Sequence, residues 1–263
     1  MVGQSRAARL AAGLTVAAAL ANAAPAVTGV PAVRSRLWPG LSGPGAGYVA
    51  LTFDDGPARA STPLFLRALA QARVRATFFL LGRMLDRDPG LGREIVAGGH
   101  DVAVHGWEHR NLLWRTPAAT YGDIARARNR IAEVTGVLPV WYRPPYGVLT
   151  TAALLACRRL GLRPRLWTTW GRDWESGATP ASVFRTVTRA LGGGGTVLLH
   201  DSDALTAPSA WRATLGALPV LIADARRRGL TVGPLVDHAT GRGPEWEARR
   251  FGRHAANGAE IWG

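Results

Sequence analysis

Short apolar runs alternate along the chain with segments in which apolar residues recur at helical spacing. The apolar runs predict seven strands, at 48–53, 76–81, 100–105, 140–143, 164–169, 196–200 and 230–235. The periodic segments predict helices near 61–73, 88–98, 118–135, 150–160, 180–191 and 209–228. Strands that alternate with helices indicate a parallel sheet, because parallel neighbours need a crossover connection.

Five short polar motifs each follow a different predicted strand. They are Thr52-Phe53-Asp54-Asp55-Gly56-Pro57, His105-Gly106-Trp107-Glu108-His109, Arg143-Pro144-Pro145-Tyr146-Gly147, Asp173-Trp174 and Leu198-Leu199-His200-Asp201. An open doubly wound sheet would not gather so many strand ends at one point, whereas a closed barrel does so at its C-terminal face. We therefore expect an α/β barrel with its catalytic site at the C-terminal ends of the strands.

An Asp and two His in these motifs have the composition of a divalent metal site. His105 and His109 stand at positions i and i+4, which would place both on one face of a helical turn. Asp54 and Asp55 end the first strand, where neighbouring side chains point in different directions. One carboxylate can then bind the metal while the other faces the substrate. We assign Asp55, His105 and His109 to the metal.

The remaining polar residues of the motifs suit proton transfer. Asp54, beside the metal ligand, is the expected base, and His200 is the expected acid. Arg143 can pair with Asp54 and keep it ionised, since an opposite charge lowers the pKa of a carboxyl group. Asp173 can hold His200 in one tautomer and favour its protonated form. This is the equipment of a metal-assisted hydrolase.

Composition limits the alternatives. A chain of 263 residues with 47% hydrophobic content is long enough for one large α/β domain. The single cysteine, Cys157, excludes an internal disulfide and argues against a thiolate metal site, and its apolar surroundings predict a buried core residue. The net charge of +14 comes from arginine alone and would suit an anionic cell-wall polymer or a membrane surface. The arginines are scattered, and the absence of a recognised motif argues against nucleic-acid binding.

The N-terminus differs from the alternating region. Arg6 and Arg9 precede an uncharged run rich in Ala, Leu and Val, and Ala21-Asn22-Ala23 fits a small-x-small cleavage pattern. We interpret this as an export signal or a membrane anchor, which places the protein outside the cytoplasm. The dominance of Ala, with Pro25 and Pro31 beyond the run, argues against a full membrane span. A cytoplasmic protein with an Ala-rich helix docked on the domain is the alternative.

The chain therefore divides into four parts. We expect an export signal or anchor at residues 1–33, a Pro- and Gly-rich linker at 34–47, the barrel at 48–236 and a C-terminal tail at 237–263.

In its motifs the chain resembles carbohydrate esterase family 4, the polysaccharide deacetylases related to the rhizobial nodulation-factor deacetylase. All five motifs match in order, over about 48–235. The resemblance implies a distorted (β/α)₇ barrel, in agreement with the seven predicted strands. It also implies that Asp55, His105 and His109 bind a divalent ion, usually zinc. Asp54 would be the base tuned by Arg143, and His200 the acid tuned by Asp173.

The resemblance further implies how the acetyl group is bound. The backbone N–H of Tyr146 would bind the oxyanion, and Trp174 and Leu198 would line the pocket for the acetyl methyl group. In one position the chain departs from the family pattern. The family usually has Ser or Thr after the first histidine of the second motif, where a hydroxyl steadies the loop, and this chain has Gly106. Glu108, between the histidines, is expected to be solvated or bonded within the loop.

Three tryptophans near the motifs could stack on sugar rings, namely Trp107, Trp114 and Trp174. Three others are expected in the core, namely Trp141, Trp167 and Trp211.

The function implied is metal-dependent N-deacetylation of N-acetylated aminosugars in a glycan such as peptidoglycan or chitin oligomers, with release of acetate. Two alternatives are an O-acetyl esterase or other amide hydrolase on the same barrel, and a non-catalytic cell-wall-binding protein. The sequence does not specify the glycan, the metal or the oligomeric state.

Overall fold

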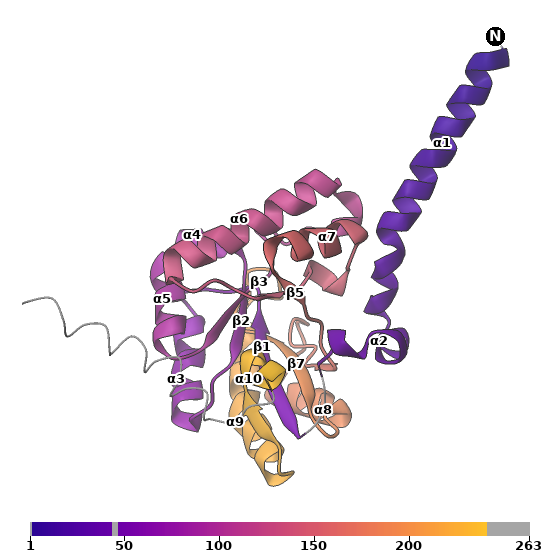
Figure 1. Ribbon diagram of the computed structural model, residues 1–263. Helices are drawn as coiled ribbons and strands as arrows, with labels where there is room; N and C mark the ends of the chain where they lie inside the picture. The colour runs from indigo at the N-terminus through magenta and orange to yellow at the C-terminus, as the bar shows by residue number, and fades with distance from the viewer. Residues whose placement is uncertain (1, 44–46, 241–263) are drawn as a thin grey trace, which may run out of the picture.

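The fold is a curled parallel sheet surrounded by helices, seen in a computed structural model that describes residues 2–43 and 47–240 (Figure 1). The strands are β1 (Tyr48–Asp54), β2 (Thr77–Leu80), β3 (Asp101–Val104), β4 (Trp141–Tyr142), β5 (Arg163–Pro164), β6 (Thr169–Trp170), β7 (Gly195–His200) and β8 (Thr231–Gly233). Their order is β5-β4-β3-β2-β1-β7-β6, and β8 pairs with the beginning of β1. Every pair is parallel, so the C-terminal ends of the strands share one edge.

The helices that connect and cover the sheet begin and end within about two residues of most sequence predictions. In the barrel they are α3 (Thr62–Ala72), α4 (Gly82–Arg87), α5 (Pro89–Ala97), α6 (Pro117–Thr135), α7 (Thr151–Leu160), α8 (Pro180–Ala190), α9 (Trp211–Arg227) and α10 (Leu235–Thr240). The predicted α/β fold class is confirmed. The sequence did not predict α4, and α10 extends into the predicted tail from 237; residues 241–263 of that tail lie outside the described part of the chain.

The core has two layers. The larger one packs the outer faces of the strands against the helices, for example Phe53 of β1 against Phe65 of α3 and Phe78 of β2. A smaller cluster fills the barrel interior, and its members are Ala50, Phe79, Ala103, Trp141 and Leu235. Leu235 belongs to α10, which therefore plugs the end of the barrel opposite the C-terminal strand ends. Cys157 is buried in the larger layer, as predicted, and burial raises the pKa of its thiol to about 12.

The barrel is not closed by strand pairing. The predicted strand at 164–169 is instead two short strands, β5 and β6, which do not pair with each other in the described part of the chain. Long side chains bind the backbone between them, because Arg143 donates hydrogen bonds to the carbonyls of Arg165 (3.2 Å) and Leu166 (3.1 Å). The Trp167 carbonyl accepts a bond of 2.7 Å from Arg34. The sheet consequently has eight strands rather than the predicted seven.

Arg34 lies in the segment predicted as a linker, and much of this segment is folded onto the barrel. Helix α2 (Pro31–Leu37) and a 3₁₀ turn (Pro39–Leu41) cross the gap between β5 and β6. The Arg34 side chain is buried and bonds Ser42 Oγ (2.6 Å) and the carbonyl of Thr28 (2.7 Å) as well as Trp167. The Leu166 N–H donates to the Leu41 carbonyl. Residues 28–42, called the collar below, thus complete the wall of the barrel; residues 44–46 lie outside the described part.

Ahead of the collar, α1 (Val2–Ala23) extends away from the barrel (Figure 1). Residues Ala8–Gly29 are long and apolar enough to cross a membrane; residues 8–21 are exposed, whereas Thr28 near the end of the stretch is buried. The α-helix ends at Ala23, and a 3₁₀ helix (Ala24–Gly29) that contains Pro25 follows, so α1 does not continue past the first proline. Its last turn contacts α7, where the Thr151 hydroxyl donates to the Ala21 carbonyl (2.7 Å) and the Ala152 N–H to Asn22 Oδ1 (3.0 Å).

Candidate active site

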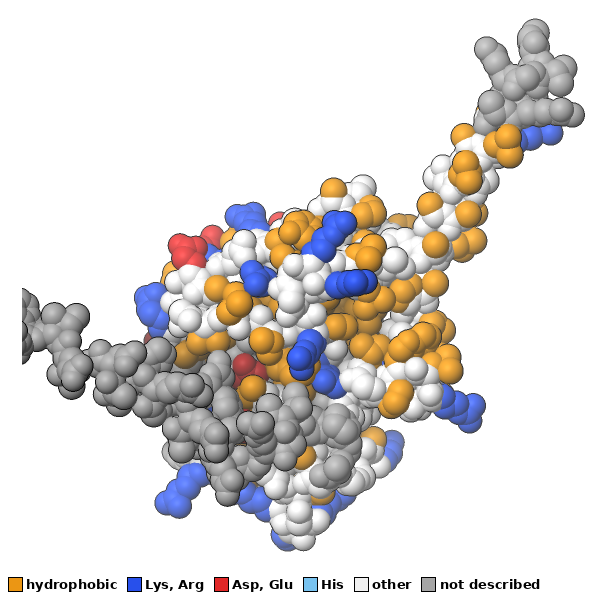
Figure 2. Space-filling view, viewed as in Figure 1, with side chains coloured by type: hydrophobic (Ala, Val, Ile, Leu, Met, Phe, Trp, Pro, Cys, Tyr) orange, Lys and Arg blue, Asp and Glu red, His pale blue; other side chains and the backbone are white. Residues whose placement is uncertain are grey.

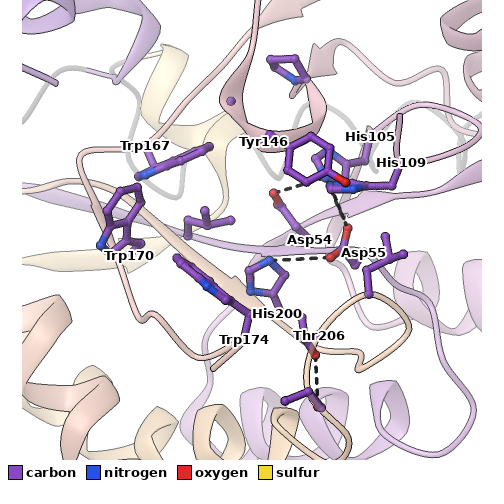
Figure 3. A pocket seen from close by; sticks show the side chains of 15 residues that line it. Asp54, Asp55, His105, His109, Tyr146, Trp167, Trp170, Trp174, His200 and Thr206 are labelled. Atoms are coloured by element: carbon purple, nitrogen blue, oxygen red, sulfur yellow. Dashed lines mark hydrogen bonds and ion pairs between the residues drawn. The ribbon is translucent and has the colours of Figure 1, made fainter. Parts of the chain in front are cut away.

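A cavity of about 460 Å³ opens at the C-terminal ends of the strands, and residues from all five sequence motifs line it (Figure 3). Asp54 and Asp55 come from the end of β1, and His105 and His109 from the loop after β3. The remaining motif residues on its wall are Pro144, Tyr146, Gly147, Trp174, Leu198 and His200. The predicted gathering of strand ends is therefore present in the structure.

The three predicted metal ligands lie together at the bottom of this cavity. One ligand atom from each of Asp55, His105 and His109 lies within 4.8 Å of the others. Asp55 Oδ1 is 3.4 Å from His105 Nε2 and 3.7 Å from His109 Nε2. This oxygen is buried and has no hydrogen-bond donor in the described residues. A buried carboxylate oxygen without a donor, beside two imidazole nitrogens, suits a divalent cation.

The backbone at Asp55 explains how two adjacent carboxylates reach one pocket. Asp55 has a φ of 71°, in the left-handed region, which ends the side-chain alternation of β1. Burial opposes ionisation of Asp55, but its contact with His105 and the other nearby imidazoles keep its pKa well below the usual range. The carboxylate is therefore ionised at neutral pH, the form in which it can bind a metal.

The two histidines reach the pocket differently from the prediction. The expected helical turn is wrong, because residues 105–109 form an irregular loop in which Gly106 has a φ of 98°. His105 Nδ1 lies 2.8 Å from the Arg143 carbonyl, which can only accept, so Nδ1 carries the proton and Nε2 is free to bind a metal. Burial lowers the pKa of His109 to about 4, so its ring is neutral. Burial is the largest single effect on His105 and lowers its pKa, but Asp54, Asp55 and the Arg143 carbonyl together outweigh burial and raise that pKa.

The predicted base is held by a buried arginine. Arg143 Nη1 donates to Asp54 Oδ1 at 2.6 Å and to Thr52 Oγ1 at 2.8 Å, and Arg143 has no exposed surface. Burial lowers the pKa of Arg143, while the charge of Asp54 opposes this effect. Asp54 Oδ2 is 3.7 Å from His105 Nε2, so the second carboxylate oxygen faces the metal ligands.

The predicted acid lies on the opposite side of Asp55. His200 Nε2 is 3.7 Å from Asp55 Oδ2, and its Nδ1 lies 3.0 Å from Asp173 Oδ1. Burial lowers the pKa of His200, but the charge of Asp173 and the hydrogen bond to it raise that pKa to about 10. In this form His200 carries a proton on the nitrogen that faces the pocket.

Asp201, next to His200, has a structural position. It is fully buried, and Thr62 Oγ1 donates to its Oδ2 at 2.5 Å. A Cβ atom at Gly56 would lie 2.6 Å from Asp201 Oδ1, so only glycine fits there in the turn after Asp55. Burial raises the pKa of Asp201 to about 7.

A row of aromatic rings forms one wall of the cavity. Ring centroids are 5.8 Å apart from Trp167 to Trp170 and from Trp170 to Trp174, and 5.7 Å apart from Trp174 to His200. Trp174 and Leu198 line the pocket, as the resemblance implies. Trp167, predicted as a core residue, packs half-buried against the larger core layer and also lines the cavity. Trp170 was missed, although it stands four residues before Trp174 at the end of β6.

Other aromatic residues are either buried in the core or lie in the loops after β3 and β4. Trp141 and Trp211 are buried, as predicted. Trp107 does not line the cavity and packs under the guanidinium of Arg126, 3.5 Å from the ring centroid. Tyr146 covers His109, with ring centroids 4.4 Å apart, and its φ of 59° turns the chain at the rim of the pocket. Arg110 Nε donates to Glu108 Oε2 at 3.0 Å, in agreement with the bond expected within the loop.

Comparison with known proteins gives consistent matches. A family model described as polysaccharide deacetylase matches residues 42–164. A chitooligosaccharide deacetylase of Bradyrhizobium sp. (strain ANU 289) is 36% identical over 198 residues, which cover 73% of this chain and 90% of that protein. The peptidoglycan-N-acetylglucosamine deacetylase PgdA of Listeria monocytogenes is 34% identical over 161 residues, covering 61% of this chain but only 34% of PgdA.

A solved structure is similar over nearly its whole length. The family 4 carbohydrate esterase from Streptomyces lividans, in complex with acetate, superposes with a TM-score of 0.64 and 34% sequence identity. The match covers 71% of this chain and 92% of that one.

Proposed function

The chain belongs to the polysaccharide deacetylase family, and we propose that its pocket removes N-acetyl groups from aminosugars of a glycan, releasing acetate. The observation that carries this proposal is the position of a carboxylate and a protonated imidazole on either side of Asp55. Asp54 is paired with buried Arg143, and His200 is paired with Asp173. A base and an acid on opposite sides of one cation site are what hydrolysis of an amide requires.

Each residue then has one task. Asp54 accepts a proton from the attacking water, and Arg143 holds Asp54 in place through the 2.6 Å contact between Nη1 and Oδ1. The Tyr146 N–H stabilises the oxyanion, and His200 donates its proton to the departing amine. Trp174 and Leu198 contact the acetyl methyl group. A divalent cation held by Asp55, His105 and His109 would polarise the carbonyl and lower the pKa of water.

We assign zinc to this site because two imidazole nitrogens and one carboxylate, with positions left open for water and substrate, form a common zinc ligand set. Magnesium and calcium are less suited, since both prefer sites made of oxygen ligands.

The substrate we propose is an oligomer or polymer rather than a single sugar. A second hollow lies beside the catalytic cavity and shares His109 and Tyr146 with it. On its far side stands Trp114, which is 87% exposed and therefore has little role in packing. An exposed indole face next to the reaction site offers a stacking surface for a neighbouring sugar ring.

The proposed location is outside the cytoplasm, with α1 as signal or anchor. Apolar side chains cover α1 and continue where it meets the barrel, and arginines are spread over the same face of the molecule (Figure 2). Arg6 and Arg9 precede the uncharged run that begins at Leu10, and basic residues before such a run favour the cytoplasmic side. The barrel would then be exported, with its positive surface available to anionic wall polymer or lipid.

The decisive experiment is acetate release by metal-reconstituted protein from chitin oligomers and from peptidoglycan, with a chelated control. Chelator-sensitive release from either polymer supports the proposal. Release from O-acetylated but not N-acetylated substrates would indicate an esterase instead. Binding to wall polymer without any release would contradict the enzymatic proposal.

A further inference from the structure

The loop that joins the two histidines is held from one side by a single carboxylate. Asp123, on α6, accepts hydrogen bonds from the backbone N–H groups of Trp107 (2.8 Å) and Glu108 (3.4 Å). The Asp123 side chain is 7% exposed, and Arg115 lies 3.6 Å from its Oδ1. These two N–H groups come directly before His109 in the chain.

Gly106 leaves the space that this carboxylate occupies. A Cβ atom at position 106 would lie 2.8 Å from Asp123 Oδ2, closer than real Cβ atoms approach other atoms. The φ of 98° at Gly106 also disfavours any other residue there. A side chain at 106 would therefore force the carboxylate of Asp123 to shift.

The opposite side of the loop is fixed to α4. The N–H groups of Gly82 and Arg83 donate to the carbonyls of Gly106 (3.0 Å) and Trp107 (3.2 Å). Loop carbonyls thus bind one helix and loop N–H groups bind another, so that the backbone from 106 to 108 is held between α4 and α6.

The two metal ligands depend on this arrangement to different degrees. His105 is held by its own contacts at the end of β3, where its N–H donates to the Leu80 carbonyl (3.0 Å) and its ring bonds the Arg143 carbonyl. His109 lies beyond the bonded segment, so its position follows that of residues 106–108.

We propose that Asp123 is a positioning residue for the metal site, which fixes the backbone before His109 and so sets the distance from His109 to Asp55. This inference depends on the proposed metal site. Hydrogen-bonding partners one step removed from a metal typically contribute about 10–100-fold to metal affinity. Asp123 acts through the backbone rather than through the imidazole ring.

The test measures zinc affinity directly. Metal-free protein is titrated with Zn²⁺ in competition with a chromogenic chelator, and its thermal melting is recorded without metal. We expect Asp123→Ala to weaken Zn²⁺ binding about 10–100-fold. Asp123→Asn should weaken it less, because one acceptor oxygen remains. Glu133→Gln is the matched control, because Glu133 lies on the same helix and is 69% exposed, and the substitution removes the same charge. The zinc affinity of this variant should equal that of the wild type.

A double-mutant cycle adds a second readout. Gly106→Ala displaces the carboxylate, so its effect and that of Asp123→Ala on zinc affinity should be less than additive. Full additivity would show that Asp123 has only a structural role. The same conclusion would follow if the Asp123→Ala and Asp123→Asn proteins bound zinc like the wild type but melted at a lower temperature. Failure of the wild type to bind any divalent ion would instead contradict the proposed function.

Discussion

Asp173 binds His200 at two points. Its Oδ2 accepts the His200 backbone N–H at 2.7 Å, and its Oδ1 lies 3.0 Å from the ring Nδ1. The Thr214 hydroxyl donates to the same Oδ2 at 2.6 Å, so the carboxylate is fixed from a third direction. Because Asp173 can only accept, Nδ1 donates to it and Nε2 must face the pocket. The position, the tautomer and the pKa of the proposed acid therefore depend on one side chain.

Asp173→Asn should move the alkaline limb of the pH profile. Asp173 raises the pKa of His200, so the variant has a lower His200 pKa and loses the catalytic proton at lower pH. We expect the fall of kcat/KM at high pH to begin about one unit or more earlier. Asp86→Asn, on the exposed face of α4, is the control. An alkaline limb that does not move would refute His200 as the acid.

Asp54→Asn should abolish most turnover without emptying the metal site. The amide cannot accept the proton of water, while Asp55, His105 and His109 are unchanged. The expected loss in kcat is about 10²–10⁴-fold. Acetate release measured beside bound zinc, by atomic absorption, checks both statements. Wild-type turnover in this variant would rule Asp54 out as the base.

Removal of metal should lower both activity and melting temperature. A ligand that binds only the folded state at 100 times its Kd stabilises it by about 2.7 kcal/mol. We expect a chelator to stop acetate release and to reduce the melting temperature, and added zinc to restore both. If the chelated protein melted at the same temperature but lost activity, the cation would be entering with the substrate rather than residing in the Asp55 site.

Arg34→Ala should weaken the barrel wall. The change removes buried hydrogen bonds to Ser42, Thr28 and Trp167, and leaves the Trp167 carbonyl without that donor. Bonds to a charged donor contribute about 1.5–3 kcal/mol each, so a loss of several degrees in melting temperature is expected. Arg36→Ala, an exposed change on the same helix, is the control.

A chain that starts at residue 24 should remain active, whereas one that starts at 43 should not.

Trp114→Ala should affect long substrates more than short ones. Loss of the stacking surface is expected to raise KM for chitin oligomers several-fold, with little change for a small acetylated substrate that fills only the catalytic cavity. Trp38→Ala, which truncates a tryptophan of the collar, provides the comparison. An equal effect on short and long substrates would place the second hollow outside the glycan-binding surface.

Sequence patterns predict local features of this chain well. Six strand regions and six helices follow from apolar spacing. The motifs contain ten of the fifteen residues that line the cavity, because each motif follows a predicted strand; the other five are Trp167, Trp170, Leu205, Thr206 and Ala207. The roles of those residues in catalysis stay predictions. The break between β5 and β6 could not be read from 164–169, since its carbonyls are satisfied by Arg143 and by Arg34, far away in the sequence.

The loop at 105–109 shows a second limit. A spacing of four residues fits a helix, but the conformation of Gly106 and the bonds from Asp123 hold the loop in another shape. Trp167 shows a third. An apolar segment does not reveal which of its faces meets an open cavity.

Because the collar is folded, almost no flexible chain separates α1 from the barrel. A flexible chain as long as the predicted 34–47 linker would have an end-to-end distance of about 20 Å, so that an anchored enzyme could move by that distance from its anchor. Here α1 contacts α7 directly, and the collar packs against the backbone of Trp167, within the wall of the reaction cavity. With α1 retained in a membrane, the reach of each molecule would equal the size of the barrel itself. Such an enzyme would deacetylate only the glycan nearest the bilayer, and would leave the outer layers of a thick wall acetylated.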